Sequence, residues 1–269
     1  MILTNSNIND IINLESVGLS MNYNKINKLK EAIEKSNKIV VFSGAGLSVN
    51  SGIPDFRSSN GIYSELFKEK LSPEEIISHS FFEKYPKIFY EFYFSKMVYL
   101  EALPNEAHTY FSYLESLGKV SAVITQNIDN LHQLAGSKNV IELHGSTNRN
   151  YCMRCGKSFN AKEAFDLYKK NNSNLPICDK CGGLIKPDVV LYEENLNERD
   201  IYKAINEIEN ADMLIVVGTS LVVYPAASFI RYFKGKYLVL LNKSETSYDN
   251  LANIVIHDDI KKIVENLKK

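Results

Sequence analysis

The chain has 269 residues, of which 45% are hydrophobic, and a formal net charge of −1. This length and apolar content predict one large domain with a sizeable core and a smaller insert. The near-neutral charge gives no reason to expect nucleic acid or a membrane as a direct partner, and no apolar run approaches the ~20 residues of a membrane span. The polar N-terminus does not read as a signal peptide, and all four cysteines fall between positions 152 and 181. We therefore expect a cytoplasmic protein rather than a secreted disulfide framework.

The first elements along the chain lead to a glycine-rich turn. Residues 1–22 read as a polar arm, and apolar positions at helical spacing predict a helix over residues 24–36. The apolar run at 39–42 predicts a buried parallel strand that leads directly into Gly44-Ala45-Gly46. Glycines at a strand-to-helix turn let backbone N–H groups approach a pyrophosphate, and a helix N-terminus adds a favourable dipole. The turn therefore predicts a nucleotide site, with a tight turn lacking any ligand as the alternative.

The segment after this turn departs from the fingerprint of a redox dinucleotide site. Phe56 offers a flat apolar wall and Arg57 a bidentate phosphate contact, which strengthens the nucleotide interpretation. However, Val49 stands where a third glycine would be expected, and the charged, helix-like segment 63–70 replaces the second strand and its terminal acidic residue. The pattern disfavours a dehydrogenase.

The rest of the chain alternates between strands and helices. An aromatic-rich helical segment spans residues 59–118. Apolar runs predict strands at 119–125, 139–144, 188–192, 213–217, 237–241 and 254–256, and helices at 197–210, 225–233 and 259–267. This alternation predicts an α/β fold with a Rossmann-like open parallel sheet and helices on both faces.

The cysteines form two Cys-x-x-Cys pairs separated by 22 residues. Four thiolates suit a tetrahedral zinc ion with no open position, so a structural zinc site is predicted, with ligands Cys152, Cys155, Cys178 and Cys181. A redox pair or free thiols are the alternatives. We expect a small zinc-binding unit inserted into the main fold.

Polar side chains gather where the predicted parallel strands end. The run TQNIDNLH (125–132) follows one strand, His144 closes the next, Gly218-Thr219-Ser220-Leu221 follows a third and Asn242 a fourth. Carboxyl ends of parallel strands share one edge, where ligands bind. The near-neutral pKa of a histidine suits a general base, so His144 is predicted to be catalytic, whereas His79, His108 and His257 are expected to be structural.

Taken in order, GAGLSVNSGIPDFRS, TQNIDNLH, the HG after a strand, the paired cysteines and GTSLVVYPAA resemble the sirtuin family of NAD-dependent protein deacylases, of bacterial type. The resemblance covers the chain from about residue 24 onward. It implies an NAD-binding Rossmann-like domain over 23–147 and 187–269, with a helical insert at about 59–118. It further implies a zinc-binding small domain over 148–186, and only the arm at 1–22 lies outside the resemblance.

The resemblance also assigns roles to matching positions. His144 would be the base and Asn127 would act beside it. NAD would lie along the cofactor loop, the TQNID segment and the later strand ends, at Gly44, Ala45, Gly46, Phe56, Arg57, Gln126, Ile128, Asp129, Gly218, Thr219, Ser220, Leu221, Asn242, Asp259 and Ile260. A substrate peptide would pair as an added strand with Val189, Val190, Leu191 and Tyr192.

The implied reaction removes an acyl group from lysine at the expense of NAD. The acyl oxygen attacks the anomeric carbon of NAD and expels nicotinamide, a product inhibitor. His144 then deprotonates a ribose hydroxyl, which attacks the imidate formed in the first step, and water finally releases lysine and O-acyl-ADP-ribose. Phe56 would shield the reactive centre from water. The chain departs from the family at Glu193, where many members have glycine, and at Val49, where threonine is common.

Three alternatives stay open at this point. The same scaffold could serve as an ADP-ribosyltransferase or NAD glycohydrolase, or as a non-catalytic zinc-containing binding module. It could also prefer another acyl group, because Tyr93 and Lys96 occupy the places of a Tyr-x-x-Arg pair that favours succinyl or malonyl lysine. Lysine cannot fork onto a carboxylate as arginine does, so deacetylation is expected as the main activity.

Overall fold

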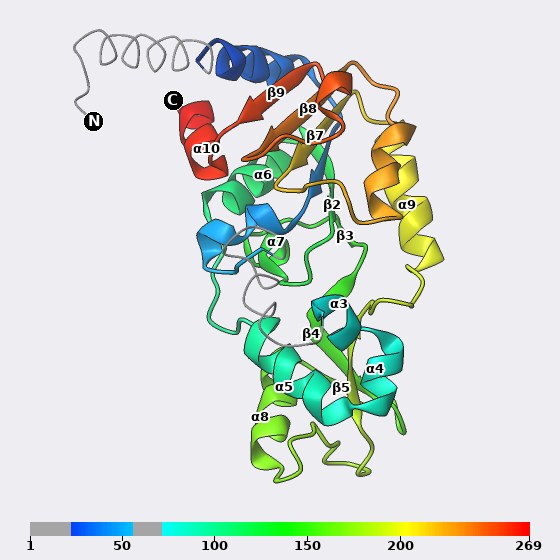
Figure 1. Ribbon diagram of the computed structural model, residues 1–269. Coiled ribbons are helices and arrows are strands. Elements are labelled where there is room, and N and C mark those ends of the chain that lie inside the picture. Colours follow the sequence, from blue (N-terminus) through cyan, green and yellow to red (C-terminus); the bar gives the residue numbers. More distant parts are fainter. Residues whose placement is uncertain (1–22, 56–71) are drawn as a thin grey trace, which may run out of the picture.

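The computed structural model describes residues 23–55 and 72–269 (Figure 1). Its largest element is a six-stranded parallel sheet in the order β3-β2-β1-β7-β8-β9. The strands are β1 Ile39–Ser43, β2 Val120–Thr125, β3 Val140–Glu142, β7 Met213–Val217, β8 Tyr237–Asn242 and β9 Ile254–His257. The strand order reverses between β1 and β7. In open parallel sheets, a ligand crevice lies outside the carboxyl ends of the strands at such a point.

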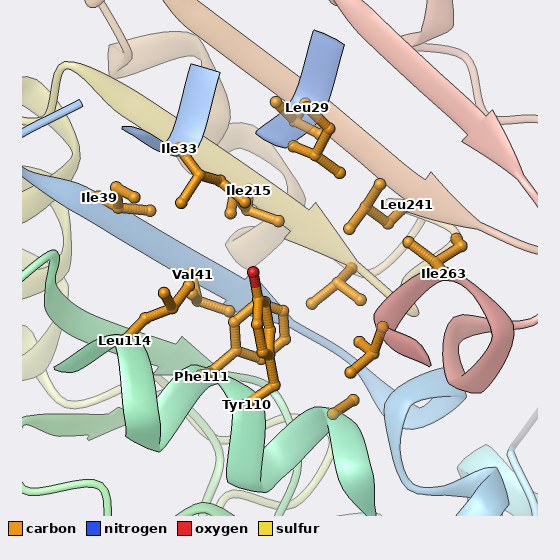
Figure 2. Packing of buried hydrophobic residues seen from close by; sticks show 14 of the residues in the cluster. Leu29, Ile33, Ile39, Val41, Tyr110, Phe111, Leu114, Ile215, Leu241 and Ile263 are labelled. Atoms are coloured by element: carbon orange, nitrogen blue, oxygen red, sulfur yellow. The ribbon is translucent and has the colours of Figure 1, made fainter. Parts of the chain in front are cut away.

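Both faces of the sheet are covered by helices. Successive side chains of each strand point to opposite faces, so each strand contributes to two cores. Along β1, Ile39 and Val41 enter one core, which a helix through residues 23–35, α6 (Glu106–Ser116) and α10 (Ile260–Lys268) cover; Figure 2 shows this packing. Val40 and Phe42 enter the other core, beneath α9 (Glu198–Glu209) and the 3₁₀ helix η3 (Ala226–Tyr232). This double coverage explains the uninterrupted apolar character of β1.

A second, antiparallel sheet of order β5-β4-β6 lies at the opposite end of the molecule (Figure 1). It comprises β4 Gly145–Cys152, β5 Ser158–Phe159 and β6 Ile185–Val189. It shares a third core with the short helices α3 (Pro73–Ile76) and α4 (His79–Lys84), with α5 (Pro86–Lys96) and with α8 (Ala161–Lys170). Aromatic side chains of α4 and α5 dominate this core, as their density in the sequence suggested.

The predicted parallel sheet with helices on both faces is confirmed, with several local differences. The strand predicted at 188–192 is instead β6, which ends at Val189 and pairs antiparallel with β4 in the second sheet. The strand was predicted too far toward the C-terminus because the apolar residues of this segment lie after Pro187. The segment 225–233 contains a 3₁₀ helix rather than an α-helix. The short helix α7 (Leu131–Leu134) and the amphipathic α8 had not been predicted.

Candidate active site and metal centre

The glycine turn after β1 packs directly against the loop after β7. The N–H of Gly44 donates to the carbonyl of Val217 at 3.1 Å, and that of Gly46 to the carbonyl of Gly218 at 2.8 Å. A Cβ on Gly44 would lie 2.6 Å from Cβ of Thr219, and one on Gly46 only 2.9 Å from Cα of Gly218. Glycine is therefore required at both positions, because the turn after β1 and the chain after β7 are in direct contact.

This geometry corrects two details of the sequence-based interpretation. The N–H groups of Gly44 and Gly46 donate to the carbonyls of Val217 and Gly218, so they do not point to a phosphate. In addition, the chain after Gly44 forms two three-residue 3₁₀ turns, η1 (Ala45–Leu47) and η2 (Val49–Ser51), rather than an α-helix. The favourable dipole of a long helix N-terminus is therefore not available there. Phe56 and Arg57 lie outside the described residues.

Beneath this turn, two buried side chains, Ser48 and Asn127, and the half-buried Asp129 form a polar cluster. The Ser48 hydroxyl donates to a carboxylate oxygen of Asp129 at 2.6 Å and accepts from Nδ2 of Asn127 at 3.1 Å. Asn127 Nδ2 also donates to the carbonyl of Gly44 at 3.2 Å, and the other Asp129 oxygen accepts from the N–H of Leu131 at 2.9 Å. Burial raises the pKa of Asp129 above its ordinary value. The sequence analysis missed Ser48, although its place directly after the glycine turn was a usable signal.

The remaining TQNID residues connect this cluster to the neighbouring strand ends. Gln126 Nε2 donates to the Thr219 hydroxyl at 3.0 Å, and that hydroxyl also accepts from the N–H of Leu221. The carbonyl of Ile128 accepts from both the N–H and the hydroxyl of Thr147. These contacts bring together the ends of β1, β2 and β7, as their polar termini predicted.

His144 lies at the same edge, immediately before β4. Its Nδ1 is 2.9 Å from the carbonyl of Gln126, and a carbonyl can only accept, so Nδ1 carries the proton of the neutral ring. Nε2 is then the unprotonated, basic nitrogen. Burial lowers the pKa of His144, which favours this neutral form. Gly145 must be glycine, since its φ is 75° and a Cβ would lie 2.0 Å from the carbonyl oxygen of Asp188.

The residues expected at the adenosine half of NAD are spread over the later strand ends. Ser220 is exposed, and the side chain of Asn242 at the end of β8 donates to the carbonyl of Ser244. Asp259 caps the N-terminus of α10 and accepts from Asn50 Nδ2 at 3.1 Å. The Ile260 side chain belongs to the core, so it offers only its backbone to a ligand.

The segment predicted to bind substrate follows β6 and is already paired on one side. The N–H and carbonyl of Tyr192 bond to the carbonyl of Ile77 and the N–H of His79, and the N–H of Val190 donates to the carbonyl of His144. The Leu191 N–H donates to the carboxylate of Glu194 at 2.9 Å. An added peptide strand would therefore meet a segment already anchored to α4 through Tyr192 and to His144 through Val190.

Glu193 occupies a left-handed backbone conformation with φ 75°. This explains why glycine suits that position, since a residue with a Cβ is strained there. The Glu193 carboxylate accepts from the N–H and hydroxyl of Ser80 in α4 at 2.9 and 3.0 Å. The side chain thus fastens the loop to the start of that helix and offsets part of the strain.

The proposed acyl-channel pair lies on α5. Tyr93 is fully buried, stacks on Phe89 at 5.7 Å between ring centroids, and has no hydrogen-bond partner for its hydroxyl among the described residues. Burial raises the pKa of this phenol. Lys96 is half-buried at the last position of the helix.

The four cysteines converge into one cluster, with all four sulfur atoms within 4.8 Å of one another. The sulfurs of Cys152 and Cys181 are 3.4 Å apart and those of Cys155 and Cys178 are 3.8 Å apart. These separations are too long for a disulfide, and they agree with the roughly 3.8 Å edge of a tetrahedron whose Zn–S bonds are about 2.3 Å. The donor set fits a structural zinc ion and excludes a redox disulfide in this geometry.

Two matching turns support each cysteine pair. The N–H of Gly156 donates to the carbonyl of Cys152, and that of Gly182 to the carbonyl of Cys178, both at 2.9 Å. Both glycines have positive φ, 69° and 72°. Two such turns present four thiolates to one point.

A parallel sheet with polar side chains gathered at its switch point, joined to a four-cysteine cluster that fits a structural metal, is typical of a nucleotide-binding protein. None of the described helices is long and apolar enough to cross a membrane. The family model of the Sir2 family matches residues 44–225. The chain belongs to the Sir2 family, which confirms the sirtuin resemblance.

Similar proteins and solved structures agree with this family assignment. The chain is 54% identical over 243 residues to an NAD-dependent protein deacetylase of Clostridium acetobutylicum, covering 90% of this chain and 98% of the relative. It is 46% identical over 244 residues to one of Staphylococcus aureus strain Mu50, covering 91% and 98%. Among solved structures, a Sir2 protein with a p53 peptide and NAD+ superposes with a TM-score of 0.77 at 38% identity, covering 89% of this chain and 95% of that one.

Proposed function

We propose that this chain is an NAD-dependent protein-lysine deacetylase. It uses NAD as co-substrate, releases nicotinamide and transfers the acetyl group to ADP-ribose, giving O-acetyl-ADP-ribose and free lysine. Its full-length relatives carry the name NAD-dependent protein deacetylase, and a Sir2 structure with a TM-score of 0.81 and 38% identity contains a deacetylated peptide and 3′-O-acetyl ADP-ribose.

The observation that carries the proposal is the setting of His144. The bond from Nδ1 to the Gln126 carbonyl leaves Nε2 basic, and burial keeps the ring neutral. The same residue bonds through its carbonyl to Val190 of the proposed peptide-binding segment. A base tied both to the TQNID segment and to the substrate segment suits transfer between NAD and a bound peptide.

The other polar residues hold the reacting groups in place. Asn127 and Asp129 are fixed through Ser48, so that the amide and the carboxylate are oriented before a ligand arrives. Asp129 is proposed to contact the nicotinamide carboxamide, Gln126 and Ile128 the nicotinamide ribose side, and the loops after β7 and β8 the adenosine half. The metal would be held by the four cysteines and would stabilise the small sheet without taking part in the chemistry.

A cytoplasmic location is proposed with this function. Four thiolates held for a metal persist in a reducing compartment, where disulfides are rare. Acyl-lysine proteins of that compartment would be the substrates.

The deciding experiment incubates the protein with NAD and an acetyl-lysine peptide and analyses the products by mass spectrometry. We expect free lysine peptide, nicotinamide and O-acetyl-ADP-ribose in equal amounts. ADP-ribosylated peptide, or free ADP-ribose without deacetylation, would instead establish a transferase or a glycohydrolase. A matched reaction with His144→Ala tests whether the products depend on the proposed base.

A further inference from the structure

Two buried histidines lie behind the proposed active site, and the reaction above does not use them. His108 is on α6 and His132 on α7, and both are almost completely inaccessible to solvent. Their ring centroids are 4.9 Å apart at an interplanar angle of 67°. Each ring has one nitrogen without a hydrogen-bond partner among the described residues, Nε2 of His108 and Nδ1 of His132. Buried polar atoms are rarely left unpaired, so this pair requires an explanation.

The hydrogen bonds of His132 determine which of its nitrogens carries the proton. Nε2 of His132 is 2.9 Å from the hydroxyl of Ser43. That hydroxyl donates its own proton to the hydroxyl oxygen of Thr125 at 2.9 Å. Ser43 can therefore only accept from His132, so the neutral ring carries its proton on Nε2. The unpartnered Nδ1 is a hydrogen-bond acceptor.

The hydrogen bonds of His108 lead to the opposite requirement. Nδ1 of His108 accepts from the N–H of Asn105 at 3.3 Å, where the histidine takes the place that Glu or Gln holds in an ordinary capping box. The neutral ring must then carry its proton on Nε2. The unpartnered Nε2–H of His108 is a donor, and it belongs to the ring adjacent to the unpartnered acceptor of His132.

We infer that one buried water bridges Nε2–H of His108 and Nδ1 of His132 and completes a polar relay from Asn105 to Asn127. A buried water needs two to four polar partners. Ser137 lies in the turn after α7, and its N–H donates to the carbonyl of His132. Its buried hydroxyl also lacks a partner within the described part of the chain, so it can supply the third contact.

Both ends of the relay reach the proposed active site. At one end, Thr125 accepts from Ser43 and from the N–H of Asn127 at 3.0 Å. At the other end, Asn105 Nδ2 donates to the carbonyl of Leu47 at 2.8 Å and to the hydroxyl of Ser51 at 3.0 Å. The relay therefore fixes the cofactor turn and the TQNID segment relative to each other. His108 and His132 are positioning residues, an assignment that rests on the proposed function.

The tautomers can be read directly by NMR, independently of any enzymatic activity. In long-range ¹H–¹⁵N spectra of the zinc-loaded protein labelled with ¹⁵N-histidine at pH 7.5, His108 and His132 should both appear as Nε2–H tautomers, whereas His144 should appear as Nδ1–H. Variants at each position assign the signals. A water NOE to Nε2–H of His108 is expected. An Nδ1–H tautomer or an imidazolium at His108 or His132, or the absence of the water NOE, would overturn the relay.

A pair of substitutions tests the positioning role. His132→Gln places an amide N–H where Nε2 lies and should retain most of kcat/KM for NAD, whereas His132→Leu should lose on the order of tenfold or more, because small misplacements of reacting groups are costly. Equal losses in the two folded variants would contradict the role. If His132→Leu does not fold, Ser43→Ala breaks the same relay at its central hydroxyl and should show the same loss. Normal kinetics in Ser43→Ala would count against the relay. If the wild-type protein does not deacetylate the peptide, the proposed function is refuted, but the NMR test of the tautomers and of the bridging water remains valid.

Discussion

The hydrogen bond from His144 to the Gln126 carbonyl determines which imidazole nitrogen is basic. His144→Ala should therefore abolish deacetylation, lowering kcat by about 10²-fold or more, because it removes the proposed general base. NAD affinity should stay within a few-fold of the wild type, since the base acts after NAD has bound. Steady-state turnover and NAD binding by calorimetry check both statements, and a variant that keeps a tenth of wild-type turnover would refute the assignment.

Asp129 offers a second test at the level of a single side chain. Asp129→Asn keeps the size of the residue but removes the carboxylate that accepts from Ser48. We expect weaker nicotinamide inhibition and slower nicotinamide exchange, since the carboxylate is proposed to contact the carboxamide. Inhibition curves measured beside those of Ser48→Ala separate a direct contact from lost orientation. Unchanged inhibition in Asp129→Asn would remove the residue from the nicotinamide site.

Tyr93 and Lys96 of α5 are the residues proposed to influence which acyl group is removed. We expect a higher kcat/KM for an acetylated than for a succinylated version of the same peptide, because a lysine gives a succinyl carboxylate only a point charge. Lys96→Ala should lower the succinyl activity further and leave the acetyl activity unchanged. Ser95→Ala, an exposed neighbour on the same helix, serves as the control. A preference for succinyl-lysine in the wild type would reverse this prediction.

Some site residues could be predicted from the sequence and others could not. The position of His144 beside the TQNID segment and the convergence of the four cysteines could be predicted, because strand ends and paired Cys-x-x-Cys spacing restrict where these residues lie. Ser48 was missed because a serine after a glycine turn is common, and only the structure shows its hydroxyl between Asn127 and Asp129. The requirement for glycine at Gly44 was predicted for the wrong reason, since contact between distant loops leaves no local signal.

At the level of elements, the two cysteine turns act as one unit. Cys155→Ser should reduce bound zinc from one ion per chain to well below one and lower the melting temperature, because binding of a structural metal contributes to the free energy of folding. Met153→Ser provides a matched control, since Met153 lies exposed on the same turn and its side chain is not in the cysteine cluster. Metal analysis and thermal denaturation test the pair. Equal zinc content in Cys155→Ser and the wild type would contradict the proposed ligand set.

Parallel strands were easier to predict than the antiparallel sheet. β1 and β7 are buried on both faces, so their sequences are continuous apolar runs. β4 runs from Gly145 to Cys152 and contains Asn, Arg and Tyr, and its residues pair with β6 residues that lie 33 to 44 positions further along the sequence. No local pattern distinguishes such a polar strand from a loop.

At the scale of the whole molecule, stability should depend on pH through the buried histidines. Burial lowers the pKa of His108 to about 4 and that of His132 to about 3. Their full contribution to stability is present above the unfolded pKa of about 6.5. As pH falls below that value, the unfolded chain takes up protons that the folded chain does not, and each histidine costs up to about 1.4 kcal/mol per pH unit.

Urea unfolding at pH 7.5, 6.0 and 5.0 measures this effect. We expect a steep loss of stability between pH 6.5 and 5, and a shallower slope in His132→Gln, which removes one of the titrating groups. Comparing the two proteins separates the histidines from acid release of zinc, because both proteins keep the four cysteines. Identical slopes would show that His132 does not contribute to the pH dependence.

The third core has a consequence for protein engineering. Its aromatic side chains come from α4 and α5, whereas its metal site and sheet come from residues 145–189, and the two parts are joined by the bond from the Tyr90 hydroxyl to the Ile185 carbonyl. A fragment covering 148–186 would leave behind Phe89, Tyr90 and Tyr93. Such a fragment should not fold when excised or transplanted into another scaffold, even with zinc present. A transplantable module would have to carry residues 72–97 as well, joined through a new linker.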